Sequence, residues 1–399
     1  MIITLLIISL WFVAFVWFVV VVLTFHGVSR QQSLLATNNL RLTAGDAPLI
    51  SILVPARNEQ DRVLEDCIRS IFAQDYGRFE VIAVNDRSTD STLEILQTLA
   101  QRDERLRVIE GEDLPPGWLG KPYAMHQALN QARGEWILAT DADMIFETAV
   151  LRTALARTLE AKGEALTLIP RFEALSFWER VMIPTWEWVF LMFTVFYRIN
   201  DPKTDRAAAI GGFFLIKRSV LDSVGGYERL KDEVMEDVRL AERIKRSGAR
   251  LLIDRAPTMI RTRMYRTFGE MWECSTKNWF AGMNFSLPLA LFCVVSMYLF
   301  AVAPPLIAFA AAAVAIASGA DFGSLFIPAA LSWLLQVIVM AVISIRSRVS
   351  PVYALTSPLG LGVIYAMLFD SSIRISTGRG VTWKGRRIYE RRGVRPPKS

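Results

Sequence analysis

The chain has 399 residues, of which 52% are hydrophobic and 21% are charged, and its formal net charge is +6. It is too apolar for an ordinary soluble protein and too highly charged for one that lies wholly within a membrane. The apolar residues gather near the two ends of the chain, whereas residues 48–270 have the mixed composition of an α/β domain. The sequence therefore predicts a soluble domain between membrane-spanning segments.

The first predicted element is a transmembrane anchor within residues 1–28. Its uncharged run, residues 2–24, is long enough to span a bilayer. It lacks a basic leading segment and a small-residue cleavage site, so we expect a retained anchor rather than a cleaved signal peptide. Positive charge follows at Arg30 and Arg41. The positive-inside rule then puts the amino terminus outside and residues 48–270 in the cytoplasm.

Buried-type strands alternate with amphipathic helices in the first half of the domain. The expected strands cover residues 49–54 (ending at Pro55), 79–84, 106–109 and 135–139, and the expected helices cover residues 61–72, 91–101 and 121–131. This alternation predicts a mostly parallel sheet with helices on both faces. Ligands of such sheets bind at the carboxyl ends of the strands, where Pro55, Asp86 and Asp141 all fall.

An acidic cluster, Asp141-Ala142-Asp143, follows the strand at residues 135–139. Two carboxylates one residue apart repel each other unless a cation or strong hydrogen-bond donors neutralise them. Mg²⁺ and Mn²⁺ take oxygen ligands and keep positions open for substrate phosphates. The cluster therefore suggests a metal–diphosphate site, although acidic pairs also cap helices and occupy turns.

The loops after the first two strands carry further polar candidates. In the run Asn85–Asp90, the carboxylate of Asp86 can accept hydrogen bonds from a base or a ribose. The alternative is a plain capping loop, which explains Asp90 better than Asp86. Residues 55–59 sit at the equivalent point of the first strand, where their backbone would line the same pocket.

Aromatic residues crowd residues 177–199, where charges at Glu179, Arg180 and Glu187 argue against a central membrane position. An amphipathic helix in the headgroup plane fits this composition, because Trp and Tyr prefer that zone. A helix in the interior of the protein is the alternative.

A carboxyl-terminal membrane region covers residues 285–370. If Pro304-Pro305 mark a turn, four crossings return the chain to the cytoplasm, and the shortness of the resulting segments also allows re-entrant geometry. The tail, residues 371–399, carries nine Lys or Arg residues and one Glu from residue 374 onward. We expect it in the cytoplasm, facing an anionic leaflet rather than nucleic acid.

Four segments resemble, in order and spacing, the motifs of family-2 glycosyltransferases. They are Val54–Glu59, Asn85–Asp90, the acidic cluster at 141–143, and Met235-Glu236-Asp237. The family has an α/β GT-A fold and inverts the anomeric centre of nucleotide-diphosphate sugars. With its anchor and apolar carboxyl-terminal region, the chain looks most like the membrane-bound branch related to ceramide glucosyltransferases and hopanoid-associated glycosyltransferases, in a bacterial-type inner or plasma membrane.

The resemblance implies a role for each acidic residue. Asp86 would contact the nucleotide base, and Asp141 the ribose or the metal region. Asp143 would bind the Mg²⁺ or Mn²⁺ ion that neutralises the diphosphate leaving group. Asp237 would be the general base, with a pKa raised by burial near Glu236. The alternative for this last pair is an exposed helix start, which suits the helix dipole.

Other candidates lie in the loops around these carboxylates. Pro55, Ala56 and Glu59 would line the nucleotide-sugar pocket. Lys121 follows the segment Gly117-Trp118-Leu119-Gly120 and would reach phosphate oxygens from a helix start, unless that segment is a surface turn. Gly211 and Gly212 are expected to begin a strand and to leave room for an acceptor or sugar beside the sheet.

One motif departs from the family pattern. Many relatives carry Q/R-x-x-R-W just before the membrane, whereas the matching positions here include Ser275, Asn278 and Trp279. Trp279 fits the pattern, and Lys277 would supply a point positive charge near the acceptor and diphosphate. The departure favours transfer of a single sugar over processive synthesis.

The sequence thus predicts a glycosyltransferase that moves one sugar from a nucleotide donor, UDP by default, to a hydroxyl of a membrane lipid. A processive polysaccharide synthase is the alternative within the same class. From another class, the alternative is a transporter or scaffold with a degenerate transferase domain.

Overall fold

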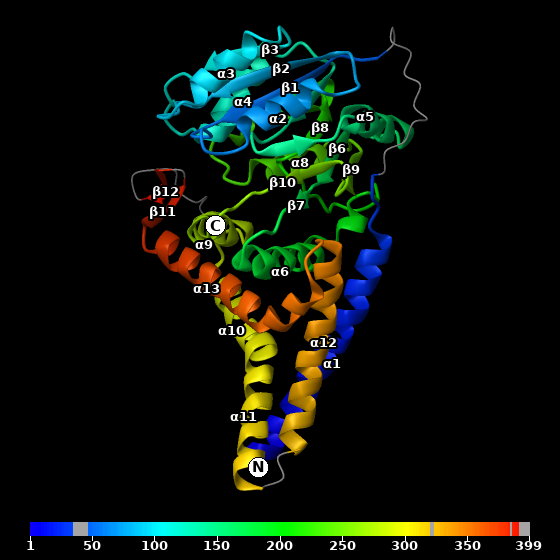
Figure 1. Ribbon diagram of the computed structural model, residues 1–399, viewed down its shortest axis with the longest axis vertical. Coiled ribbons are helices and arrows are strands. Elements are labelled where there is room, and N and C mark those ends of the chain that lie inside the picture. The colour runs from blue at the N-terminus through cyan, green and yellow to red at the C-terminus, as the bar shows by residue number, and fades with distance from the viewer. Residues whose placement is uncertain (35–46, 320–322, 384, 391–399) are drawn as a thin grey trace.

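The computed structural model describes residues 1–34, 47–319, 323–383 and 385–390. An α/β domain lies at one end of the molecule, a layer of helices lies beneath it, and long apolar helices extend from that layer to the other end (Figure 1). Some of the basic residues used to predict the membrane topology fall outside the described residues, namely Arg41, Lys384 and those in residues 391–399.

The central sheet has seven strands in the order β3-β2-β1-β4-β8-β6-β9. Only β8 runs antiparallel to its neighbours within this sheet, so the prediction of a mostly parallel sheet is confirmed. The strands are β1 (Ile50–Ala56), β2 (Phe79–Asn85), β3 (Leu106–Glu110), β4 (Trp136–Ala139), β6 (Ala165–Ile169), β8 (Phe214–Lys217) and β9 (Leu251–Arg255).

Two predicted strand boundaries are wrong. The strand β1 continues through Pro55 to Ala56 in its pairing with β2. Its pairing with β4 ends at Leu53, so on that side Pro55, which lacks an N–H group, faces no paired strand. Gly211 and Gly212 form a turn ahead of β8 rather than its first residues.

Helices cover both faces of the sheet, because successive residues of each strand point to opposite sides. In β1, Ile52 and Val54 join one apolar core, while Leu53 joins the other. The first core also takes in α2 (Leu64–Phe72), α3 (Thr92–Ala100) and α5 (Val150–Glu160), and the second takes in α4 (Gly120–Gln131), α7 (Arg218–Ser223) and α8 (Glu236–Arg246).

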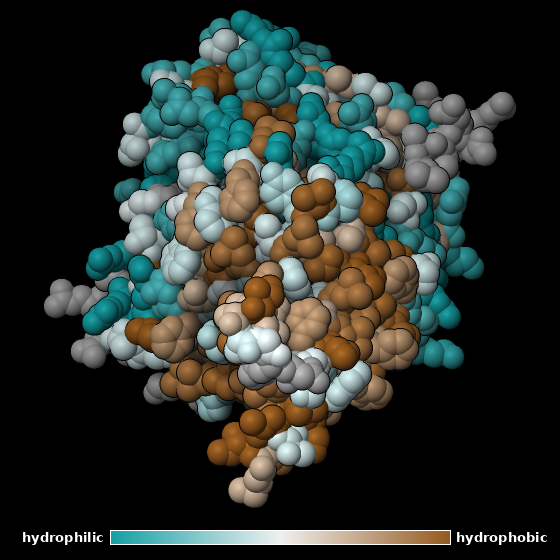
Figure 2. All heavy atoms as spheres, turned by 60° about the horizontal axis from the view of Figure 1, so that its bottom comes forward, coloured by the Kyte–Doolittle hydropathy of each residue, from teal (hydrophilic) through white to brown (hydrophobic). Residues whose placement is uncertain are grey.

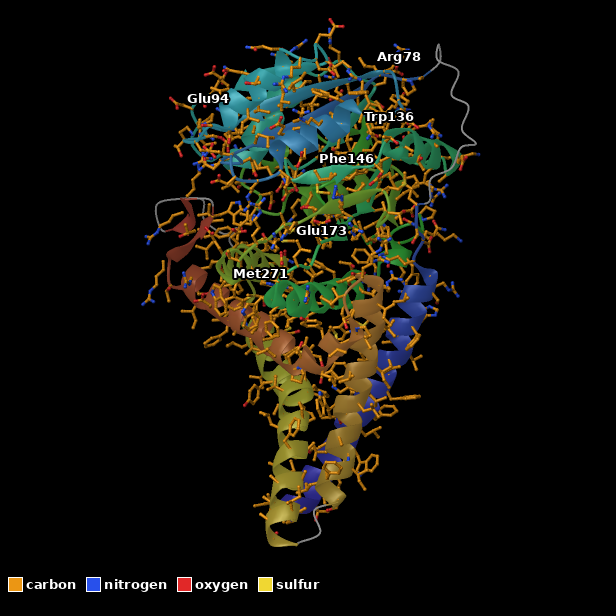
Figure 3. All side chains as sticks on the ribbon, in the orientation of Figure 1. Arg78, Glu94, Trp136, Phe146, Glu173 and Met271 are labelled. Carbon is orange, nitrogen blue, oxygen red and sulfur yellow. The ribbon has the colours of Figure 1, made fainter. Side chains whose placement is uncertain are left out.

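A small second sheet leads from the domain toward the helix layer. Its strands are β5 (Met144–Phe146), β10 (Ile260–Thr262) and β7 (Arg171–Phe172), in that order. Figure 3 follows the descent through three labelled side chains: Phe146 at the level of the sheets, Glu173 below it, and Met271 in the helix layer.

Three helices make up this layer: α6 (Phe177–Thr194), α9 (Phe268–Gly282) and α13 (Ser357–Ser376). A capping box between Ser176 and Glu179 fixes the start of α6. Most of the apolar side chains of α6 are buried, although Phe177 and Phe190 are exposed. The helix therefore packs between the domain and the apolar helices, and its place in the headgroup plane stays a prediction.

Four helical segments are long and apolar enough to cross a membrane, and the face in Figure 2 that carries them is predominantly hydrophobic. They are α1 (Ile2–Arg30), Leu287–Ser318, α12 (Gly323–Arg346) and Pro351–Ser376. The last of these contains α13, which runs obliquely beneath the domain instead of beside α11 and α12 (Figure 1).

The expected turn at Pro304-Pro305 is wrong. The helix is continuous from α10 (Leu287–Met297) through a π-helical segment, Tyr298–Val302, into α11 (Ala303–Ser318). Both prolines fall in the first turn of α11. A proline has no backbone N–H group to donate to the preceding turn of a helix. The π-helical segment in front of the two prolines reduces the number of regular α-helical hydrogen bonds that are lost for this reason.

The described part of the tail forms a hairpin of β11 (Arg379–Trp383) and β12 (Arg386–Glu390). The strand β11 packs against α9 and α13. The guanidinium Nη1 of Arg386 lies 3.1 Å from Asp86 Oδ2 in the α/β domain. The hairpin therefore contacts both the helix layer and the α/β domain.

Candidate active site

The carboxyl ends of β1, β2 and β4 meet the start of α8 at one edge of the central sheet. Asp86 follows β2, Asp141 follows β4, and Glu236 and Asp237 open α8. The amino-terminal turn of α8 favours negative charge near its N–H groups. The fold therefore brings together acidic residues that lie up to 151 positions apart in the sequence, from Asp86 to Asp237.

Lys121, at the start of α4, supplies positive charge to this acidic cluster. Its Nζ lies 2.7 Å from Asp141 Oδ1 and 2.8 Å from Glu236 Oε1. Desolvation works to lower the pKa of Lys121, but attraction by Asp141, Glu236 and Asp237 outweighs it and raises this pKa well above its ordinary value. The lysine thus stays charged and partly neutralises the carboxylates around it.

Two backbone N–H groups hold the carboxylate of Asp237. Gly211 N donates to Oδ2 and Val238 N donates to Oδ1, each at 2.8 Å. Desolvation and the nearby charge of Glu236 raise the pKa of Asp237 to about 6, against the opposing effect of Lys121. This carboxylate has a fixed orientation and can exchange a proton near neutral pH.

Gly211 permits the close approach of these groups. A Cβ at this position would lie 3.1 Å from Lys121 Nζ and 3.3 Å from Asp237 Oδ2. At Gly212, by contrast, a Cβ would meet the side chain of Met144 at 2.7 Å. The side chains of Lys121 and Asp237 therefore lie close to Gly211, and Met144 fills the space beside Gly212. Room for an acceptor or sugar beside these glycines stays a prediction.

A small cavity opens between these groups. It is lined by Lys121, Met125, Ala139, Thr140, Gly211, Phe214, Tyr227, Glu236, Asp237 and Leu240. Sequence reasoning missed Tyr227, whose pKa is raised by burial and by Glu236. The aromatic residue comes from a 3-10 helix, Gly226–Leu230, that packs on α4.

Asp86 lies at the expected nucleotide end of the same edge and is only 5% exposed. Arg87 Nε donates to its Oδ1 at 3.0 Å, and Arg57 Nη1 donates to its backbone carbonyl at 2.7 Å. Asp86 N also donates to Ala56 O at 2.8 Å, which ties this loop to the end of β1.

The other residues predicted to line the nucleotide-sugar pocket lie at the end of β1 and in the loop that follows it. Pro55 and Ala56 close β1 at this edge, and Glu59 is buried with its backbone N donating to Thr92 Oγ1 at 2.8 Å. Thus the first-strand loop lies beside the Asp86 loop, as the alternation of strands predicts.

Asp143 is half-buried in the turn between β4 and β5. Burial raises the pKa of Tyr265 well above its ordinary value, and the charges of Asp143 and Asp141 add to this effect. Tyr265 in turn contacts Cys274 of α9 and stacks edge-on against Trp186 of α6 at 5.1 Å. The charges of the acidic cluster therefore act on a tyrosine that packs against the helix layer.

Lys277 and Trp279 connect α9 to other elements. Lys277 Nζ lies 4.2 Å from the ring centroid of Trp383 in the hairpin, and the ring of Trp279 stacks on Phe190 of α6 at 6.3 Å. The contacts observed for both residues are thus packing contacts, and a role at the diphosphate or acceptor stays a prediction.

Residues 51–225 match the family model described as glycosyl transferase family 2. These residues are a family 2 glycosyltransferase domain. The match includes Asp86, Lys121, Asp141 and Asp143 and ends before Glu236 and Asp237. For residues 51–225 the match agrees with the family predicted from the motifs, while the ceramide and hopanoid branch stays a prediction.

Several glycosyltransferases resemble part of this domain. The putative teichuronic acid biosynthesis glycosyltransferase TuaG of Bacillus subtilis is 35% identical over 96 residues, 24% of this chain and 36% of that protein. A beta-monoglucosyldiacylglycerol synthase of Nostoc is 37% identical over 101 residues, 25% and 21% of the two chains. The GalNAc(5)-diNAcBac-PP-undecaprenol beta-1,3-glucosyltransferase of Campylobacter jejuni is 31% identical over 113 residues, 28% and 35%. The alignments thus span about a third of these relatives or less.

A solved structure resembles nearly the whole chain. The mannosyltransferase PcManGT of Pyrobaculum calidifontis, in complex with GDP-Man and Mn²⁺, aligns with a TM-score of 0.55 at 20% identity over 92% of this chain and 98% of that one. The GT-A fold expected from the motifs is confirmed by this likeness.

Proposed function

We propose that the protein transfers one sugar from a nucleotide-diphosphate donor to a hydroxyl of a membrane lipid and inverts the anomeric centre. The observation that carries this proposal is the Asp237 carboxylate, which is held by two backbone donors beside Glu236 and Lys121. Its raised pKa, about 6, suits a general base at neutral pH.

The donor would lie along the strand-end edge. Asp86 would bind the base, with Pro55, Ala56 and Glu59 lining that part of the pocket. Asp141 would contact the ribose, and Lys121 at the start of α4 would pair with phosphate oxygens. UDP is our default nucleotide, although the mannosyltransferase PcManGT binds GDP-Man.

The donor set of the acidic cluster fits a hard divalent cation. Asp141 and Asp143 offer carboxylate oxygens, the ligands that Mg²⁺ and Mn²⁺ prefer. No group of three or more metal-binding side chains stands ready among the described residues, so oxygens of the diphosphate would complete the ligand set. When bound, the ion supplies positive charge opposite the leaving group, and PcManGT is a precedent for Mn²⁺ on this fold.

The reaction requires one proton transfer and one displacement. The acceptor oxygen attacks the anomeric carbon while its proton passes to a carboxylate oxygen of Asp237. The bond from that carbon to the diphosphate oxygen breaks, and the nucleoside diphosphate leaves with the bonding pair. The N–H groups of Gly211 and Val238 keep the Asp237 carboxylate oriented for this step.

A lipid acceptor is supported by the surroundings of the acidic cluster. Tyr265, whose pKa is raised mainly by burial and also by the charges of Asp143 and Asp141, packs on Trp186 of α6. Trp178 of α6 packs on Phe268 of α9 at 4.5 Å. An aromatic layer thus lies between the site and helices that could span a membrane. The names of two relatives include a glycosylated diacylglycerol and a polyprenol-linked saccharide. We place the domain on the cytoplasmic side, with α6 and α9 near the headgroups.

The experiment incubates membranes that contain the full chain with a panel of UDP- and GDP-sugars, followed by mass spectrometry of extracted lipids. We expect one lipid class to gain the mass of a single sugar from one donor, and EDTA to abolish this product. Growth of a polymer, or the absence of a modified lipid with every donor, would contradict the proposal.

A further inference from the structure

The carboxyl-terminal hairpin reaches the nucleotide end of the candidate site. Arg386, the first residue of β12, donates from Nη1 to Asp86 Oδ2 at 3.1 Å, across a separation of 300 residues in the chain. The same carboxylate receives Arg87 on its Oδ1. Both oxygens of Asp86 therefore bind guanidinium groups.

The body of the hairpin is anchored away from Asp86. Val381 and Tyr389 are buried, the ring of Tyr389 packs against Phe285 at 5.3 Å, and Trp383 lies under the ammonium of Lys277. Trp383 pairs with Arg386 at the turn end of the hairpin. These contacts fix the base of Arg386 and aim its long side chain at the domain.

Arg386 lies between Asp86 and the start of α4. A Cβ built on Gly120 would overlap Arg386 Nη1 and would lie 2.6 Å from Asp86 Oδ2. The guanidinium therefore fills the gap between Asp86 and the start of α4, next to Lys121. This is the gap through which a donor held by Asp86 and Lys121 would extend.

Asp86 has other arginine partners besides Arg386. Arg87 donates to the carboxylate of Asp86, and Arg57 donates to its backbone carbonyl, and neither hydrogen bond involves Arg386. Nearby positive charge from Arg386 also contributes, after burial, to a lowered pKa of Arg57. Departure of Arg386 would relieve this repulsion and uncover Asp86.

We propose that Arg386 is a built-in competitor of the donor: it holds Asp86 in the donor-free protein, and the nucleotide must displace it. The carboxyl-terminal hairpin would thereby set the affinity for the nucleotide sugar. This inference rests on the proposed role of Asp86 in binding the base.

The test measures binding of UDP and of GDP, each with Mn²⁺, to the full chain in detergent by titration calorimetry. In Arg386→Ala we expect the Kd of the preferred nucleotide to fall roughly two- to fivefold, the scale of a partly exposed ion pair. The KM for the donor should fall by a similar factor with kcat unchanged. Arg386→Gln, which keeps the length of the side chain without its charge, should act in the same direction.

Arg387→Ala is the matched control, because it removes the same charge from the next residue, which is exposed and pairs with Thr382. It should leave Kd and KM at their wild-type values. Weaker or unchanged nucleotide binding in both Arg386 variants would overturn the competition and leave the proposed function standing. Failure of the wild-type protein to bind either nucleotide would overturn both.

Discussion

The proton affinity of Asp237 depends on its neighbour Glu236. Desolvation and Glu236 raise the pKa of Asp237 to about 6, and Lys121 opposes them. A general base must be deprotonated to act, so kcat/KM should rise with pH and level off above an inflection near pH 6. Glu236→Gln removes the like charge and should move this inflection to lower pH.

The pH dependence of kcat/KM for the two proteins checks this prediction. Glu242→Gln is a suitable control, because Glu242 lies on the same helix and pairs with Arg239 at 3.0 Å. It should leave the inflection in place. An inflection that stays put or moves upward in Glu236→Gln would contradict the coupling of the two carboxylates.

Gly211 offers a second test of the site geometry. The added methyl group of Gly211→Ala would lie 3.1 Å from Lys121 Nζ and 3.3 Å from Asp237 Oδ2, closer than normal contacts allow. The two charged groups would shift by tenths of an ångström, and we expect kcat to fall roughly tenfold. Steady-state kinetics would show this loss. Gly77→Ala, where a Cβ meets nothing within 4 Å, should retain full activity.

At the residue scale, sequence reasoning found groups that carry charge at strand ends but not their partners. The motifs identified Asp86 and Asp141 at strand ends, Asp237 at a helix start and Lys121 as a phosphate-binding candidate, and the fold brings Asp141 and Asp237 around Lys121. The ion pair from Lys121 to Glu236 and the contact of Arg386 with Asp86 were not predicted. Such contacts depend on how distant elements pack, and no local periodicity encodes them.

At the scale of elements, close packing of α13 on α6 sets the geometry of the helix layer. A Cβ on Gly360 would lie 2.5 Å from Thr185 Oγ1 and 3.3 Å from the carbonyl oxygen of Val181. We expect Gly360→Val to separate these helices and to destabilise the protein by roughly 1–3 kcal/mol.

Thermal unfolding in detergent would measure this change as a lower Tm. Gly362→Val on the same helix is the control, because its Cβ would meet only Val302 Cγ2 at an ordinary 3.7 Å. A Tm for Gly360→Val equal to that of the control would show that the two helices do not depend on this contact.

Strands and helices of the first half of the domain were predictable to within a few residues, because hydrophobic periodicity marks them directly. The antiparallel direction of β8 was not predicted, because the chain returns to the sheet only after it has passed through β7 and α6.

Pro304-Pro305 predicted a break where the structure has a π-helical segment and an unbroken helix. Proline restricts the backbone locally, but the packing of neighbouring helices decides whether the helix ends.

At the scale of the whole molecule, the three long helices α1, α10–α11 and α12 should cross the membrane while α13 remains on the side of the domain. Ser318 then lies across the membrane from the hairpin residue Arg387, and both are exposed. In separate variants, Ser318→Cys should react with an impermeant maleimide from outside and Arg387→Cys only from the cytoplasmic side. Labelling of intact cells and of inverted vesicles distinguishes the sides, and reaction of both positions from one side would contradict this topology.

The central claim is that Asp237 acts as the base in sugar transfer to a lipid. Its most direct test compares the wild-type protein with Asp237→Asn, reconstituted in liposomes with the donor and lipid found by the panel. The amide keeps the shape of the side chain but cannot accept the acceptor's proton. We predict that glycolipid formation falls by at least roughly a hundredfold while the Kd for the donor changes less than about threefold. Full transfer activity in Asp237→Asn would contradict the claim.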